Sequence, residues 1–208
     1  MLVAALTGGI ATGKSVVARI LGQKGCYIQN ADLVAHELMS PGGEVWKELV
    51  GHFGQAILKD SQEIDRQKLA GIIFRDKAER DYLNRLTHPR ILERVRQTIR
   101  ELEQRGGYDI YITEAALVIE AGFHQYYDRL ILTHCRLEVQ VERLCRRDGI
   151  SPEQALQKIK AQGPVEDKIP LAHYLIDTSG RLEETIEQTE KVYLNLYQDA
   201  LLKKSGLL

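Results

Sequence analysis

The sequence has almost no net charge and no long apolar run. Lys and Arg total 28 against 29 for Asp and Glu, which gives a formal net charge of −1. This balance provides no electrostatic footprint for general binding to nucleic acid or to an anionic membrane, so we expect neither partner. No apolar stretch approaches the ~20 residues of a membrane span, and the chain starts with core-like residues where a signal peptide would stand. We therefore expect a soluble, cytoplasmic protein.

Cysteine is also scarce. Cys26, Cys135 and Cys145 are odd in number and show no CxxC spacing, which disfavours both a disulfide framework and a zinc site. His134 and Cys135 are adjacent, but neighbouring residues at the end of a strand point to opposite faces. We expect buried, reduced thiols.

Repeats, low-complexity tracts and flexible linkers are absent as well. A chain of 208 residues can bury one sizeable core, so we expect a single α/β domain with insertions and no second autonomous domain.

A glycine-rich loop near the start is the most informative stretch that is present. The apolar run 2–6 predicts a strand buried in a parallel sheet. The loop Gly8–Ser15 then matches the phosphate-loop pattern GxxxxGK[ST]. Apolar residues on one face of a following helix are Val16, Val17, Ile20 and Leu21. Strand, loop and helix together are the context that this motif requires.

Each residue type in this loop serves the binding of a triphosphate. Backbone N–H groups at a helix N-terminus offer fixed donors and the positive end of the helix dipole. Gly8, Gly9 and Gly13 let the backbone approach the phosphate oxygens closely. Lys14 supplies positive charge toward the β and γ phosphates, and the Ser15 hydroxyl can ligate Mg²⁺. The sequence therefore predicts an ATP site with Mg²⁺.

Carboxylates follow two further strands. Asn30 is a good N-cap after a short strand at 26–28, which puts Asp32 in the first helical turn. In an open α/β sheet that position faces the ligand crevice, although an acid there equally well complements the helix dipole. A strand at 109–113 ends in Glu114, which we expect on the Mg²⁺ side. Glu120, farther along, either orients substrate or caps the next turn.

Helices dominate from Glu44 to Arg105, including two longer segments separated by His88 and Pro89. This block is too long for a plain crossover, so we expect either a helical substrate subdomain or an insertion that only covers core. His88 is a candidate to reach the cleft, although a lone histidine more often caps or packs.

A helix from Leu137 carries Arg143, Arg146 and Arg147, and a second helix begins with a cap at Ser151. Two helices with three arginines favour a lid over ATP, because guanidinium groups bind phosphate oxygens and stack on adenine. The alternative is a solvated basic helix end. A last strand at 174–176 and a C-terminal packing helix complete the chain.

Taken together, these motifs resemble the dephospho-CoA kinases, relatives of the nucleoside monophosphate kinases, along nearly the whole chain. The matching segments are LTGGIATGKS at the loop, NAD at 30–32, FG at 53–54, IDR at 64–66, HP at 88–89, ALVIE at 116–120, the series from Gln140 to Asp148, Gln162, Lys168 and IDTSG at 176–180. The chain departs from the family at Asn30, where the family usually has Asp, and at 116–118, where it usually reads PLL.

The resemblance implies a P-loop kinase fold and transfer of the γ-phosphoryl of ATP to the ribose 3′-hydroxyl of dephospho-CoA, the last step of CoA biosynthesis. It implies catalytic roles for Asp32, Lys14 and Arg143, and metal binding by Ser15 and Glu114 stands beside them as the expectation drawn above from the loop and the strand. ATP-binding residues would be Gly8, Gly9, Ile10, Ala11, Thr12, Gly13, Lys14, Ser15, Val16 and Arg147. Acceptor-binding residues would be Asp32, His88, Leu117 and Glu120.

The corresponding domain plan has a core (1–30, 107–140 and 172–208), a helical acceptor insertion (31–106) and a lid (about 141–171). Alternatives are another small-molecule or nucleoside monophosphate kinase and a nucleotide-sensing module without catalysis. A GTP-binding switch is disfavoured because the chain lacks an NKxD motif and its DxxG match, Asp177–Gly180, comes too late.

Overall fold

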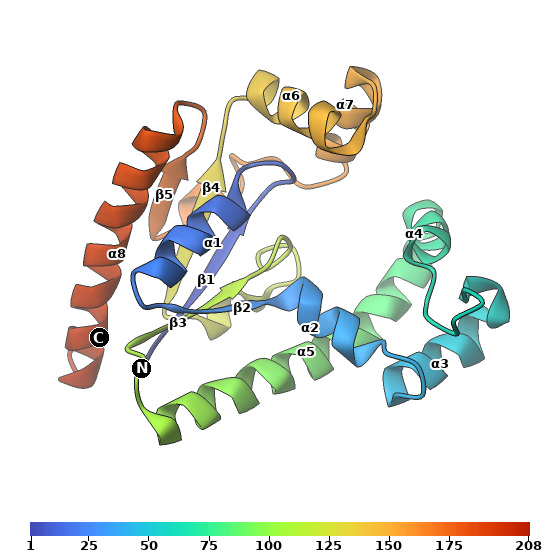
Figure 1. The fold of residues 1–208 in the computed structure, drawn as a ribbon, viewed down its shortest axis with the longest axis horizontal. Helices are drawn as coiled ribbons and strands as arrows, with labels where there is room; N and C mark the ends of the chain where they lie inside the picture. Colours follow the sequence, from blue (N-terminus) through green and yellow to red (C-terminus); the bar gives the residue numbers. More distant parts are fainter. The chain divides into compact units, whose positions relative to one another are not determined.

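The computed structural model describes residues 1–208 and divides them into two compact units (Figure 1). The first unit comprises Met1–Gln29 and Leu102–Leu208, and the second comprises Asn30–Glu101.

The first unit is built on a parallel sheet of five strands in the order β2-β3-β1-β4-β5 (Figure 1). The strands are β1 (Leu2–Gly8), β2 (Tyr27–Asn30), β3 (Ile110–Glu114), β4 (Arg129–His134) and β5 (Tyr174–Asp177). The central strand β1 places Leu6 beside Glu114 of β3 and beside Ile131 of β4. The predicted α/β class with a parallel sheet is confirmed.

Two helices, α1 (Lys14–Gln23) and α8 (Leu182–Lys204), pack together against one face of this sheet. The buried side chains there come from alternate strand positions and from the apolar faces of the helices: Leu2, Ala4, Leu6, Val17, Ala18, Leu21, Cys26, Ile110, Ile112, Ile131, Ile176, Val192, Leu196 and Ala200. The opposite face buries Ala5 and Leu130 against Val118, which belongs to the segment that follows β3. Both faces of the sheet are covered, as the apolar strand sequences require.

Beyond the end of β4, α6 (Leu137–Asp148) and α7 (Pro152–Lys160) pack side by side (Figure 1). Ser151 and Gln154 form the predicted capping box at the start of α7, with Pro152 at the first helical position. Two short 3₁₀ turns, Phe123–Tyr126 and Ile169–Leu171, complete the first unit.

Four helices make up the second unit: α2 (Ala31–Leu38), α3 (Glu44–Phe53), α4 (Arg66–Arg75) and α5 (Lys77–Arg105), whose last four residues belong to the first unit. A 3₁₀ turn, Gln55–Ile57, follows α3. The buried core of this unit is separate and consists of Val45, Leu49, Ile57, Leu58, Ile64, Leu69 and Leu86. Asn30 caps α2 and Asp65 caps α4, each accepting two backbone N–H bonds.

The predicted break at His88 and Pro89 is wrong, because α5 runs through both residues as one helix of 29 residues. A proline inside a helix removes one backbone hydrogen bond and usually kinks or ends it. The carbonyl group that loses its N–H partner is that of Arg85, four residues before Pro89. Side chains nearby donate to other carbonyl groups of the helix. The Thr87 hydroxyl donates to Leu83 O (2.8 Å), and the Arg90 guanidinium donates to Leu86 O (2.8 Å).

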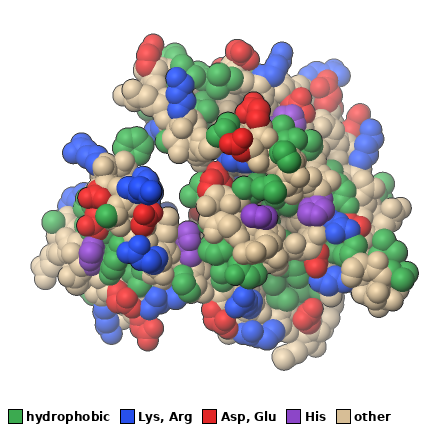
Figure 2. All heavy atoms as spheres, turned by 180° about the vertical axis from the view of Figure 1, so that it is seen from behind, with side chains coloured by type: hydrophobic (Ala, Val, Ile, Leu, Met, Phe, Trp, Pro, Cys, Tyr) green, Lys and Arg blue, Asp and Glu red, His purple; other side chains and the backbone are tan.

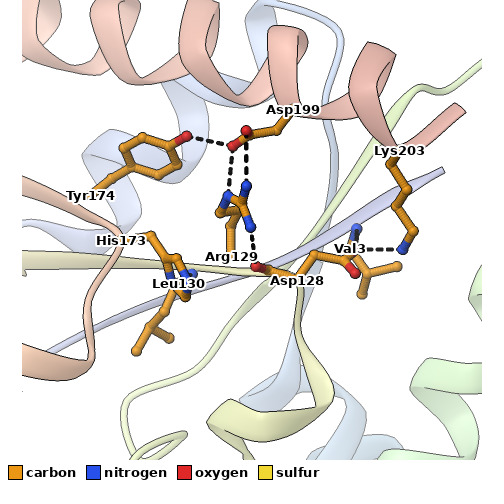
Figure 3. Close-up of polar contacts among 8 residues, drawn as sticks. All are labelled: Val3, Asp128, Arg129, Leu130, His173, Tyr174, Asp199 and Lys203. Atoms are coloured by element: carbon orange, nitrogen blue, oxygen red, sulfur yellow. Dashed lines mark hydrogen bonds and ion pairs between the residues drawn. The ribbon is translucent and has the colours of Figure 1, made fainter. Parts of the chain in front are cut away.

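A polar cluster fastens α8 to the first residues of β4 and β5 (Figure 3). The Arg129 guanidinium makes a bidentate pair with the Asp199 carboxylate, at 2.7 and 3.0 Å, and the Tyr174 hydroxyl donates to the same carboxylate. One turn farther along α8, Lys203 pairs with Asp128, whose carboxylate also accepts the Val3 N–H (2.8 Å). The helix is therefore held by charge as well as by apolar contact.

None of the helices combines the length and the apolar character that crossing a bilayer requires. On the face shown in Figure 2, Lys and Arg side chains stand among Asp and Glu side chains. Positive and negative side chains are therefore interspersed on that face, in agreement with the small net charge of the chain.

Candidate active site

The loop between β1 and α1 has the backbone conformation that its glycines allow. Gly13 has a φ of 84° and Gly8 a φ of 154°. A Cβ on Gly8 would lie 2.2 Å from Thr133 Oγ1 and 2.5 Å from Thr133 O, so no larger residue fits there. The predicted strand, loop and helix are all present.

Thr12 holds the loop against β4. Its hydroxyl donates to Gly9 O (2.8 Å) and lies 2.9 Å from the Thr133 hydroxyl, in a buried position. The Thr133 hydroxyl in turn reaches Thr7 O (3.3 Å). The loop is therefore held by the Thr12 side chain of the loop itself and by the Thr133 side chain of β4.

Lys14 folds back over this loop. Its ammonium group donates to Gly8 O (2.7 Å) and to Gly9 O (3.2 Å). The positive charge thus lies at the loop, where the expected phosphates would bind.

Ser15 and Glu114 are brought together, as the metal prediction requires. The Ser15 hydroxyl donates to Glu114 Oε1 (2.9 Å), and Glu114 is buried at the end of β3. Hydroxyl and carboxylate oxygens are hard ligands, and Mg²⁺ is usually held by one or two protein oxygens together with phosphates and water. The pair therefore fits Mg²⁺. No group of three or more His, Cys, Asp or Glu side chains forms a closed metal site.

Arg143 of α6 reaches the loop through Thr178. Its guanidinium donates to Thr178 Oγ1 (2.9 Å) and Thr178 O (2.6 Å), and the Thr178 hydroxyl donates to Thr12 O (3.0 Å). A Cβ on Gly13 would lie 3.3 Å from Thr178. The predicted catalytic arginine and the phosphate loop are thus joined by one threonine.

Two glutamine side chains form hydrogen bonds with the backbone of Ile10 in the loop. Gln140 Nε2 of α6 donates to Ile10 O (2.6 Å), and Ile10 N–H donates to Gln162 Oε1 (2.7 Å) just after α7. A cavity of about 530 Å³ opens beside the loop, lined in part by Gly9, Thr12, Gln140, Gln162 and Lys168. Both glutamines match the family motifs, but sequence reasoning assigned them no role, because their contact with Ile10 spans more than 100 residues.

Arg147, predicted to lie against ATP, turns toward the end of α6. It pairs with Asp148 (2.7 Å), which also pairs with Lys158 of α7 (2.9 Å). Hydrogen bonds from Arg147 and Lys158 lower the pKa of Asp148 to about 2. The Arg147 contact with ATP stays a prediction.

The segment after β3 carries Leu117, which is 46 % exposed, and Glu120. Glu120 Oε1 pairs with Lys168 Nζ at 2.5 Å, and Lys168 is only 3 % exposed. The structure therefore gives Glu120 a partner within the chain, which sequence reasoning left open. Acceptor binding by Leu117 and Glu120 stays a prediction.

Asp32 and His88 belong to the second unit. Asp32 is exposed in the first turn of α2 and, with His36, Lys59 and Arg66, lines a cavity of about 750 Å³. Burial lowers the pKa of His88 in the middle of α5. Their roles toward the acceptor stay predictions, as does the approach of Asp32 to the phosphate loop.

The thiols are free of disulfides. Burial raises the pKa of Cys26 to about 12. Burial also raises the pKa of Cys135. The positive charge of nearby Arg143 lowers this pKa, but by less than burial raises it. The expectation of buried thiols is thus confirmed for Cys26 and is wrong for Cys135 and Cys145, which are half-buried.

Comparison with known proteins identifies the family. The family model described as dephospho-CoA kinase matches residues 2–184. The chain belongs to the dephospho-CoA kinase family. The predicted resemblance is thereby confirmed, and with it a transferase that binds nucleotide through a P-loop.

Relatives and solved structures agree with this membership. A dephospho-CoA kinase of Carboxydothermus hydrogenoformans is 39 % identical over 183 residues, 88 % of this chain and 88 % of its own length. That of Aquifex aeolicus is 38 % identical and covers 93 % of this chain and 97 % of its own length. The structure of a dephospho-CoA kinase from Campylobacter jejuni superimposes with a TM-score of 0.69 at 24 % identity, covering 95 % of this chain and 98 % of that one, which supports the fold.

Proposed function

We propose that this member of the dephospho-CoA kinase family transfers the γ-phosphoryl of ATP to the ribose 3′-hydroxyl of dephospho-CoA, giving CoA and ADP. The observation that carries the proposal is the phosphate loop of a chain that belongs to this family. The Lys14 ammonium group lies against the loop, and the Ser15–Glu114 pair lies beside it. Phosphoryl transfer depends mainly on positioning and on charge stabilisation, and these residues provide both.

In this proposal the loop N–H groups and Lys14 hold the β and γ phosphates, and Arg143 stabilises the charge of the transferring group. The Arg143 guanidinium already lies within one threonine of the loop, through Thr178. An arginine aimed at the transferring phosphoryl is a recurring device for this chemistry.

Asp32 is the proposed base for the acceptor. Its carboxylate would accept or orient the proton of the 3′-hydroxyl as that oxygen forms its new bond to the γ phosphorus and the bond to the β-γ bridging oxygen breaks. The exposure of Asp32 beside the cavity of the second unit leaves its side chain accessible to a ligand.

Ser15 and Glu114 are the proposed ligands of Mg²⁺, directly or through water, because their oxygens already lie 2.9 Å apart. When bound, the ion would neutralise phosphate charge. We propose a cytoplasmic location for the enzyme, because its proposed substrate ATP is abundant there. The insertion at 31–106 and the lid at about 141–171 complete the proposal.

An acceptor panel tests the activity. Purified protein with Mg²⁺ and ATP is offered dephospho-CoA, nucleoside monophosphates and shikimate, and ADP release is followed. We expect turnover with dephospho-CoA and little with the others. Preference for a nucleoside monophosphate would favour the alternative kinase, and nucleotide binding without turnover would favour a sensing module.

The Asp32→Asn variant tests the base. We expect kcat to fall by about 100-fold or more, the usual scale for a general base, while the KM for ATP changes little. Glu37→Gln, an exposed carboxylate on the same helix that does not line the cavity, is the matched control. Unchanged turnover in Asp32→Asn would remove Asp32 from the mechanism.

The Lys14→Ala variant tests the phosphate loop. We expect transfer to be lost and ATP binding to weaken, with the thermal unfolding temperature nearly kept, because the carbonyl groups to which the ammonium group donates, Gly8 O and Gly9 O, belong to the phosphate loop and not to the apolar core. Retained kcat and KM would contradict the assignment of the loop.

A further inference from the structure

Ile10 of the phosphate loop is hydrogen-bonded through both of its backbone polar groups. Its C=O accepts from Gln140 (2.6 Å), and its N–H donates to Gln162 (2.7 Å). The two side chains lie close over the loop, since a Cβ on Gly9 would come within 3.0 Å of Gln140 Nε2 and 3.4 Å of Gln162 Oε1. The loop therefore carries a donor that is already occupied.

A phosphate oxygen of a nucleotide could replace only one of these two hydrogen bonds. A phosphate oxygen is an acceptor, so it cannot take the place of the Gln140 amide group, which donates. It can take the place of Gln162 Oε1, which accepts from the Ile10 N–H. Backbone N–H groups of such a loop are the donors that phosphates use. A phosphate oxygen is therefore chemically able to replace Gln162 Oε1 as the acceptor of the Ile10 N–H.

The position of Gln162 is enforced from within the first unit. Gln162 lies in the turn after α7, and the following chain leads to Lys168, whose buried ammonium group pairs with Glu120. A Cβ on Gly163 would lie 4.0 Å from Lys168 Cε, so the lysine stem runs beside the Gln162–Gly163 turn. This anchor presents the carboxamide to the loop.

We propose that Gln162 is an internal competitor of ATP: its carboxamide oxygen holds the Ile10 N–H until a phosphate oxygen replaces it, and this exchange sets the affinity for the nucleotide. The inference rests on the proposed binding of ATP at the phosphate loop. Gln162 is in this sense an affinity-determining residue, while Gln140 keeps the peptide oriented in both states.

Substitutions of Gln162 separate competition from support. Gln162→Ala and the nearly isosteric Gln162→Met both remove the competing oxygen, and we expect each to lower the Kd for ATP by about 2- to 10-fold, the range of one net hydrogen bond. Gln162→Glu keeps the shape but places a carboxylate beside the phosphates, and we expect it to raise the Kd by about 5-fold or more. A merely supporting side chain would weaken binding in all three variants.

Isothermal titration of the full chain with ATP, without acceptor, measures these values. The matched controls are Gln157→Ala and Gln157→Glu, which change an exposed glutamine of α7 that does not line the cavity. We expect less than a 2-fold change for both. Adenosine, which has no phosphate, should bind Gln162→Ala and the unchanged chain equally.

Weaker ATP binding by both Gln162→Ala and Gln162→Met, or equal binding by Gln162→Glu and Gln162→Ala, would overturn the competition. Absence of ATP binding by the unchanged chain would overturn the proposed function and this inference with it. A normal Kd in the unchanged chain with the wrong order of variants would overturn this inference alone.

Discussion

The cluster that fastens α8 to the sheet gives a quantitative prediction for Arg129→Met (Figure 3). The side chains of Arg129 and Asp199 are only 20 % and 12 % exposed, and they share two hydrogen bonds. Removing one partner of a buried pair costs about 3–5 kcal/mol because it leaves a charge without compensation. Tyr174 still donates to Asp199 in the variant, so we expect the free energy of unfolding to fall by about 2–3 kcal/mol.

The assay is urea unfolding followed by far-UV circular dichroism, which reports on the helical content of the whole chain, including the 23 residues of α8. In a chain of this length the loss corresponds to a fall in Tm of roughly 4–12 °C. Arg146→Met is the matched control, since its pair with Glu142 is more than 70 % exposed on both sides and should contribute less than about 1 kcal/mol. Equal losses in the two variants would refute the argument from burial.

The same pair sets the pH dependence of this loss. Burial opposes ionisation of Asp199, but hydrogen bonds from Arg129 and Tyr174 outweigh it and lower the pKa of the carboxyl. A lowered folded pKa contributes stability above the unfolded value, near 3.9, that disappears as the pH falls through the folded value. The difference between Arg129→Met and the unchanged chain should therefore be full at pH 7 and shrink below about pH 4. A constant difference down to pH 2 would contradict this linkage.

Three further predictions concern the loop, the metal pair and a thiol. Gly8→Ala should abolish transfer and lower the Tm, because the added Cβ would lie 2.2 Å from Thr133 Oγ1. Steady-state kinetics and thermal unfolding curves test this prediction, and a normal kcat would contradict it. Glu114→Gln keeps a partner for Ser15 but loses charge, so the Mg²⁺ concentration for half-maximal activity should rise about 10-fold or more, whereas an unchanged Mg²⁺ titration would exclude Glu114 as a ligand. Cys26, whose pKa burial raises to about 12, should resist a disulfide reagent at pH 8 until urea unfolds the chain, and rapid labelling of the native protein would contradict that burial.

Local sequence signals predicted much of the fold. The cap at Asn30 and the capping box at Ser151 act within three residues, so their geometry follows from residue type and spacing alone. The buried strands and the glycine loop are equally local. Pro89 shows the limit of this approach: proline disfavours a helix interior, yet the 29-residue helix α5 continues through it.

The candidate site was predictable in part, for a related reason. Ser15 and Glu114 could be paired because the order of parallel strands brings their ends together. The partners of Ile10 and of Glu120 could not be predicted, since Gln162 and Lys168 lie 152 and 48 residues away and no spacing rule connects them. Only the folded chain brings such residues into contact.

These contacts determine what binding of a triphosphate involves. In the structure without ligand, the charged groups at the loop already form hydrogen bonds within the chain. Lys14 donates to Gly8 O and Gly9 O, and Arg143 of α6 donates to Thr178. Binding therefore exchanges internal hydrogen bonds for bonds to phosphate, so affinity reflects the difference between the two sets. The internal bonds order the loop before a ligand binds, which lowers the ordering cost of binding.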